Sequence, residues 1–144
     1  MAYRTIHSKG DYRTEEVAAA GTITPGMLCE MTSAATVQAH STEGGRAERL
    51  VAMEDALQGR AVSTNYSASE IVTLGLPVPG TEMAMLIASG ESANIGDELV
   101  SAGDGTLKNA SNLASASMNE QVIAIAVESF TTLSENTLKL VRIV

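Results

Sequence analysis

The sequence has little aromatic content, a single cysteine and no tryptophan. The one cysteine, Cys29, cannot form an internal disulfide, which excludes a secreted scaffold held together by disulfides. Aromatic residues make up only 3% of the chain while hydrophobic residues make up 44%, so the core has to be built from aliphatic side chains and methionine. A chain of 144 residues fits one domain, or two only if both are tiny. A single domain of this size buries roughly 70% of its unfolded surface, enough to fold without disulfides or metal.

Positive charge is also scarce. The chain has 9 Lys and Arg residues against 17 Asp and Glu residues, and its net charge is −8. Because nucleic acids and anionic membranes attract clustered basic residues, this balance disfavours both as partners. The sequence lacks an apolar run long enough to span a membrane, and residues 1–11 show no signal peptide. We therefore expect a protein made in a reducing cytoplasm.

Residues that carry chemistry are few as well. The chain has two histidines, His7 and His40, too few with one cysteine for a typical zinc site. It contains neither a nucleophile elbow nor a phosphate-binding glycine loop. We interpret Cys29, beside Leu28, as a small core residue. The alternative is a catalytic dyad of Cys29 and His40. We expect no catalytic residue, no cofactor and no enzyme activity.

Acidic residues occur in two clusters that invite a functional reading. Neighbouring carboxylates point to opposite faces of a strand, so Glu54 and Asp55 do not form an acid–base pair by themselves. Asp97, Glu98 and Asp104 lack the alternation of calcium ligands in an EF-hand loop. Both clusters are interpreted as solvated turns, and no metal is expected.

Short apolar segments separated by glycine and proline indicate β-structure. Pro25-Gly26 favours a tight turn, and Asp104-Gly105 favours a hairpin. One helical turn is expected over residues 54–60, ending at Gly59, and the alanine-rich residues 17–20 and 113–116 are candidate short helices. We find no internal repeat. The expected strands cover residues 27–32, 35–40, 47–53, 71–76, 82–88, 98–101, 106–108, 121–128 and 137–144.

This pattern predicts an all-β fold, a small β-barrel or β-sandwich with at most one or two short helices. Residues 1–14 are polar and lack sustained periodicity, so we predict an extended N-terminal arm followed by a single β-rich domain over residues 15–144. Within the arm, Tyr3, Arg4, Tyr12 and Arg13 are candidate partner contacts, because Tyr and Arg dominate binding hot spots. The alternative is an arm that is simply disordered.

The middle of the chain resembles the small head decoration proteins of phages, also called cement proteins. Residues 17–130 carry the resemblance in four stretches. They are Leu50-Val-Ala-Met-Glu-Asp-Ala-Leu-Gln-Gly-Arg60 with Tyr66, Leu76-Pro-Val-Pro-Gly80 leading into Leu86-Ile-Ala-Ser-Gly-Glu91, Ile95-Gly-Asp-Glu-Leu-Val-Ser-Ala-Gly-Asp-Gly-Thr-Leu107, and Val122-Ile-Ala-Ile-Ala-Val-Glu128.

The resemblance implies a non-enzymatic protein made in the host bacterial cytoplasm. It implies that the protein binds the outer surface of the expanded capsid, stabilises the shell and contacts the major capsid protein. It also implies self-association, commonly as a homotrimer. Two alternatives remain open. The first is another structural protein, either a virion subunit from the tail or baseplate or a β-sandwich adhesion module. The second is a small-ligand carrier or enzyme, which requires a pocket with convergent polar groups.

Overall fold

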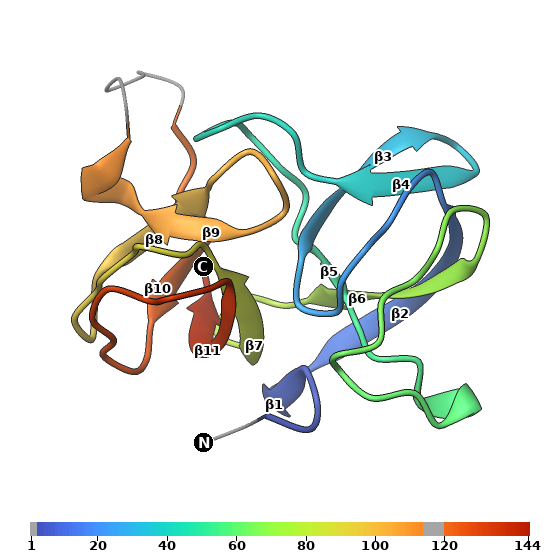
Figure 1. Cartoon of the computed structure of the whole chain (residues 1–144), viewed down its shortest axis with the longest axis horizontal. Coiled ribbons are helices and arrows are strands. Elements are labelled where there is room, and N and C mark those ends of the chain that lie inside the picture. The colour runs from blue at the N-terminus through green and yellow to red at the C-terminus, as the bar shows by residue number, and fades with distance from the viewer. Residues whose placement is uncertain (1–2, 114–119) are drawn as a thin grey trace.

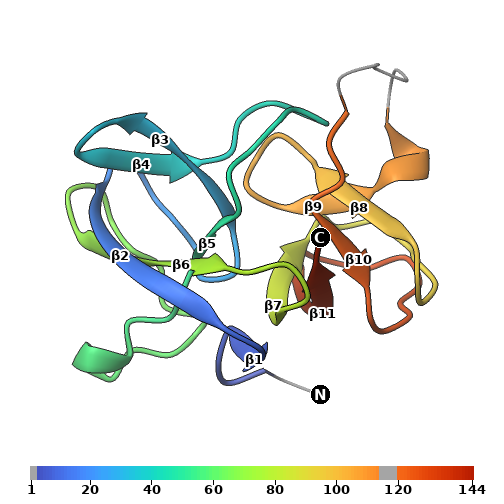
Figure 2. The ribbon, with the colours of Figure 1, turned by 180° about the vertical axis from the view of Figure 1, so that it is seen from behind.

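The computed structural model describes residues 3–113 and 120–144, and the chain is almost entirely β-structure, which confirms the predicted fold class. The two short 3₁₀ helices are η1 (Ala56–Gln58) and η2 (Ala110–Asn112). Figure 1 shows two lobes side by side, with β1 (His7–Lys9) beside the junction between them. The view from behind in Figure 2 shows the same arrangement.

The first lobe is a closed barrel of five strands in the order β2-β4-β3-β5-β6. All pairs in it are antiparallel except β2 with β4, which is parallel. Its strands are β2 (Tyr12–Ala19), β3 (Leu28–Ser33), β4 (Thr36–Ala39), β5 (Leu50–Ala52) and β6 (Ile71–Pro77).

The second lobe is built from the last five strands of the chain, β7 to β11, and β1 joins it at the edge of β7. A parallel pairing of Ile87 in β7 with Leu107 in β9 closes these strands on themselves. Its strands are β7 (Glu82–Ile87), β8 (Glu98–Ser101), β9 (Leu107–Asn109), β10 (Ala124–Ala126) and β11 (Thr137–Ile143).

The two lobes have the same topology. Strands β2 to β6 pair in the same order, and with the same parallel closure, as strands β7 to β11. The register also matches: Cys29 pairs with Leu50 in the first lobe, and Leu99 pairs with Ala124 in the second. The chain is therefore two tandem barrels of one design, a repeat that the sequence analysis did not detect.

The turns of the two barrels also match. Gly26 donates its N–H to Ala52 O at 2.8 Å, and Gly96 donates to Ala126 O at 2.9 Å. Both glycines have nearly the same positive φ, +94° and +95°. Each lobe also has one isolated bridge outside its strands, joining Ile23 to Tyr66 and Ala93 to Phe130. Residues 26–39 and 96–109 thus correspond position by position.

Two hydrophobic clusters fill the molecule. The smaller one lies inside the first barrel and includes Val37, Leu74 and Tyr66, whose hydroxyl donates to Met53 O at 2.7 Å. The larger one fills the second barrel and continues into the first, because Leu28 and Val51 belong to it together with second-barrel residues. The two barrels therefore share one core cluster.

The N-terminal segment is part of this body. The Ile6 side chain is fully buried, and Ala84 donates its N–H to Ile6 O at 2.8 Å. β1 pairs with β7, and the first residues of β2 pair with β6, including Thr14 with Gly75. Where the sequence analysis placed an arm over residues 1–14, the structure has two paired strands from residue 7 onward, since backbone pairing orders even a polar segment.

Most predicted strands are present with ends shifted by a few residues, although strands β5 and β10 are shorter than predicted. The helical turn ends at Gly59, at φ +69°, as predicted. Residues 17–19 belong to β2, so the helix expected over residues 17–20 is wrong. The helix expected over residues 113–116 lies outside the described residues, apart from Leu113. Within the described ranges, no helix has the length and apolar character needed to cross a membrane.

Candidate partner-docking surface

The four predicted contact residues lie on different parts of the surface. Tyr3 is half-buried at a groove between the two barrels, whereas Arg4 is exposed to solvent. Tyr12 and Arg13 are neighbours on β2, so their side chains point to opposite faces of that strand. The structure therefore brings Tyr12 and Arg13 onto one exposed strand and separates Tyr3 from them.

Tyr3 is already occupied within the chain. Its hydroxyl donates to the carboxylate of Glu128, which also accepts the N–H of Leu140 at 2.9 Å and forms an ion pair with Lys139 at 3.4 Å. Burial and this carboxylate raise the pKa of Tyr3 to about 12. The side chain anchors the N-terminal segment to β11 and its preceding loop, so it is not free for a partner.

Glu128 has a pKa below its usual range. Burial acts to raise it, but the hydrogen bonds from Tyr3 and Leu140 and the charge of Lys139 together outweigh burial and lower it. A carboxylate with a depressed folded-state pKa stabilises the fold above its unfolded pKa of about 4.3. That stabilisation is lost as the pH falls through the lower folded-state value.

Replacing Glu128 with Gln should therefore cost about 0.5–1 kcal/mol at pH 7, because the side chain is partly exposed and its contacts are screened. The difference between wild type and variant should shrink as the pH is lowered through the usual glutamate range. Urea unfolding of both proteins at a series of pH values measures this. A difference that stays constant down to the acid limit contradicts the assignment, and the exposed Glu135→Gln is the control.

One edge of β2 is unpaired over residues 12–17 in the part of the chain that the structure describes. Asp11 O accepts Val78 N–H, and Ala19 N–H bonds to Glu70 O, so the odd-numbered residues bond to β6. The main-chain groups of Tyr12, Thr14 and Glu16 consequently point to the open edge. The matching edge of β7 is covered by β1.

A shallow groove of about 250 Å³ lies beside this strand. Tyr12 is 36% exposed and its ring lies 4.6 Å from that of His7, while Leu57 opposite is 91% exposed. The other residues that line the groove are Thr14, Glu16, Met53, Glu54, Ala56 and Thr73. An exposed tyrosine and leucine beside a free strand edge form a surface suited to a protein partner.

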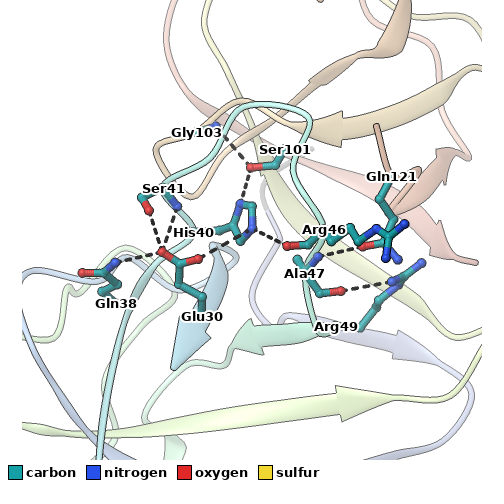
Figure 3. A network of polar contacts seen from close by, with 10 residues as sticks. All are labelled: Glu30, Gln38, His40, Ser41, Arg46, Ala47, Arg49, Ser101, Gly103 and Gln121. Atoms are coloured by element: carbon teal, nitrogen blue, oxygen red, sulfur yellow. Dashed lines mark hydrogen bonds and ion pairs between the residues drawn. The ribbon is translucent and has the colours of Figure 1, made fainter. Parts of the chain in front are cut away.

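The buried polar network at the barrel junction is the other site that sequence inspection highlights, because it contains His40 (Figure 3). His40 Nε2 lies 3.0 Å from Arg46 O, a group that only accepts, so Nε2 carries a proton. Nδ1 lies 2.7 Å from Ser101 Oγ, which accepts the Gly103 N–H at 3.2 Å. The imidazole thus links the end of β4 to the end of β8.

Glu30 extends this network at the surface of the first barrel (Figure 3). Hydrogen bonds from Ser41 and Gln38, and the nearby His40, lower its pKa against the effect of burial. Arg49 donates to Val122 O at 3.0 Å, and Gln121 Oε1 accepts the Ala47 N–H at 2.7 Å. The bonds of His40, Arg49 and Gln121 join the two barrels, which indicates a structural role for this network.

The alternative dyad of Cys29 and His40 does not form. The Cys29 thiol is buried and points to Met27 O at 3.6 Å, and burial raises its pKa to about 12. A nucleophilic cysteine needs a depressed pKa and a base in hydrogen-bond contact, whereas the pKa of this thiol is raised and it points to a main-chain carbonyl.

The acidic residues considered as calcium ligands serve local turns. Asp97 accepts the N–H of Asn94 and the amide of Asn109, and Asp104 accepts from Thr106. In the described ranges, no group of three His, Cys, Asp or Glu residues is arranged to hold a metal ion.

Sequence reasoning missed three strongly exposed aliphatic residues. Leu57, Ile71 and Ile95 are 91%, 55% and 70% exposed. Ile71 begins a predicted strand and Ile95 precedes a glycine, and neither position signals exposure by itself. Only their place in the two barrels shows that these side chains are turned outward.

No family model matches the chain, and a search of curated proteins returns no match. Among solved structures, the fold is similar to the N base of the head fiber gp8.5 of bacteriophage phi29. The TM-score is 0.56 at 14% sequence identity, over 93% of this chain and 95% of that chain. At this identity the likeness is one of fold, and its coverage includes both barrels.

Proposed function

We propose that this chain is a phage virion structural protein that binds the outside of the expanded head as a decoration (cement) protein. The observation that carries the proposal is the shared fold with the base of a phage head fiber, which extends over nearly the whole of both chains. A head fiber and a cement protein are both components of a phage head. The sequence resemblance to decoration proteins points the same way.

The proposed role is non-enzymatic, with the major capsid protein as the partner. It is supported by the buried, hydrogen-bonded state of Cys29 and His40, which leaves neither free to react. A net charge of −8 favours solubility at the high copy number that decoration requires. Three copies acting together would engage several capsid sites at once and gain avidity from weak individual contacts.

Arg4, Tyr12 and Arg13 are the residues proposed to contact the capsid. All three are exposed, and the last two lie on β2, the strand whose edge is open. Point variants test them better than removal of residues 1–14, because that deletion also removes buried Ile6 and uncovers β7.

Co-sedimentation with expanded, undecorated capsids from the same phage tests the proposal, with unexpanded procapsids as the comparison. We expect saturable binding to expanded shells only. Tyr12→Ala and Arg13→Ala should each weaken binding roughly tenfold. Arg46→Ala, which removes an exposed arginine side chain from a loop of the same barrel, is the matched control.

Either of two results contradicts the proposal. Absence of binding to both shells by folded protein removes the cement role and favours the tail or baseplate alternative. Unchanged binding by the Tyr12 and Arg13 variants leaves the role but shows that another surface docks.

A further inference from the structure

The two barrels meet through unlike surfaces. The turn at Pro25-Gly26 of the first barrel is buried against β7 and β11 of the second. Leu86 donates its N–H to Gly26 O at 3.0 Å, and the Leu138 side chain packs so closely on Gly26 that a Cβ has no room there. The contact thus joins a turn of one barrel to the outer face of two strands of the other.

Because the barrels are equivalent, each half of this contact has a second copy in the chain. Ile95-Gly96 in the second barrel corresponds to Pro25-Gly26, as their matching φ angles and hydrogen bonds to β10 and β5 show. Ala20 donates its N–H to Val37 O as Ala88 donates to Leu107 O, so Ala18 corresponds to Leu86. Ile71 in the first barrel therefore corresponds to Leu138, since Ile71 pairs with Ala18 and Leu138 pairs with Leu86.

Both second copies are open to solvent. Ile95 is 70% exposed where its counterpart Pro25 is buried, and a Cβ added to Gly96 meets no atom within 4 Å. Ile71 is 55% exposed where Leu138 is packed against the core. The chain therefore presents an uncovered turn on one barrel and an uncovered strand face on the other, each with an isoleucine at its centre.

We propose that the Ile95-Gly96 turn of one copy packs on the Ile71 face of the next copy, repeating between molecules the contact that joins the barrels within one molecule. A contact between two different surfaces is heterologous, so it builds a closed ring or an open filament. With three copies the ring contains six barrels in which every barrel is joined to its neighbours by the same kind of contact.

This inference gives an interface to the homotrimer of the proposed function. It rests on that function only for the number of copies. The interface itself follows from the duplicated barrels. Since each copy carries a net charge of −8, repulsion opposes the apolar contact, and added salt should strengthen association by screening it.

Sedimentation velocity over a concentration series tests the interface with wild type, Ile71→Asp and Ile95→Asp. We expect wild type to form trimers and each variant to be at least tenfold weaker in association, with unchanged far-UV circular dichroism. Val78→Asp is the matched control, because Val78 is a similarly exposed β-branched residue just after the opposite end of β6, at 48%.

Mixing the two variants makes the test specific. Ile71→Asp retains an intact Ile95 turn and Ile95→Asp retains an intact Ile71 face, so the mixture should form dimers with one restored contact and stop there. An interface in which each isoleucine packs on the same residue of the other copy would not be restored by mixing.

Wild type that stays monomeric at all concentrations and salt levels overturns the inference, as does an oligomer that both variants leave intact. Capsid co-sedimentation of the same samples separates the two proposals. A monomer that saturates expanded shells removes this interface and leaves the cement role. A trimer that binds neither shell supports this interface and removes the cement role.

Discussion

Gly105→Ala should lower the free energy of unfolding by about 3–5 kcal/mol, a large fraction of the stability of an ordinary domain. Gly105 has φ +86°, a region where a non-glycine residue costs roughly 1–3 kcal/mol. An added Cβ would also lie 2.9 Å from Ala39 Cβ and 3.0 Å from Met27 Sδ. Overpacking of this kind costs about 1–3 kcal/mol more.

The position matters because Gly105 lies at the barrel junction. Its carbonyl accepts the N–H of Leu28 at 2.8 Å, and its own N–H donates to His40 O at 3.0 Å. Both bonds cross from the second barrel to the first, so a displaced turn loses contacts in both. Chemical denaturation followed by circular dichroism measures the loss.

Gly90→Ala is the matched control for this substitution. Gly90 has nearly the same φ, +83°, but a Cβ there meets no atom within 4 Å. It should therefore show the backbone cost alone, about 1–2 kcal/mol. Equal losses for the two variants would mean that the packing around Gly105 is looser than the structure indicates.

His40→Leu should destabilise the protein by about 2–4 kcal/mol. Leucine fills a similar volume, but it removes the acceptor of the Ser101 hydroxyl proton and the donor to Arg46 O, and leaves Ser101 Oγ only the Gly103 N–H. His40 is 1% exposed and Ser101 is fully buried, so water does not replace the bond between them. Each buried polar group left without a partner costs about 1–3 kcal/mol.

His7→Leu makes the same chemical change at the other histidine. His7 Nε2 bonds to Gly10 O at 2.8 Å in an exposed turn, so its replacement should cost less than about 1 kcal/mol. Thermal and urea unfolding of both variants gives the comparison. If His40→Leu were as mild as His7→Leu, the network in Figure 3 would not contribute to holding the barrels together.

The strands were predictable because their signals are local. Alternating or β-branched runs such as residues 71–76 and 98–101 lie between glycine and proline turns, and the structure has strands there. The Pro25-Gly26 turn and the hairpin around Asp104 follow from which residues tolerate positive φ. The helix expected at residues 17–20 failed because four residues are too few to nucleate a helix, even with the high helix propensity of alanine, and pairing with β6 outweighs that propensity.

The duplication was not predictable from residue identity. The equivalent strands β2 and β7 have opposite character, with exposed Thr14, Glu15 and Glu16 in one and buried Glu82, Met83 and Ala84 in the other. Hydrogen bonding by the backbone is the same for any side chain except proline, so one topology accepts two different sequences. The two strands differ in which segments of the chain pack against them.

The candidate contact residues also divide into those that the sequence could predict and those that it could not. Composition alone indicated that Tyr12 and Arg13 are suited to binding, and both are exposed on β2. It gave no means to see that Tyr3 is bound to Glu128, far along the chain, or that Ile95 is uncovered while its counterpart Pro25 is buried.

The sequence by itself determined the all-β class, the turns and the expectation of an acidic protein without reactive groups, because these depend on backbone preferences and side-chain chemistry at each position. Only the tertiary structure decided that the strands form two equivalent barrels, that His40 lies at their junction, and that Ile71 and Ile95 occupy the two uncovered halves of a contact used once within the chain. Those features depend on which distant segments cover one another, and burial of that kind is a property of the packed molecule rather than of any stretch of sequence.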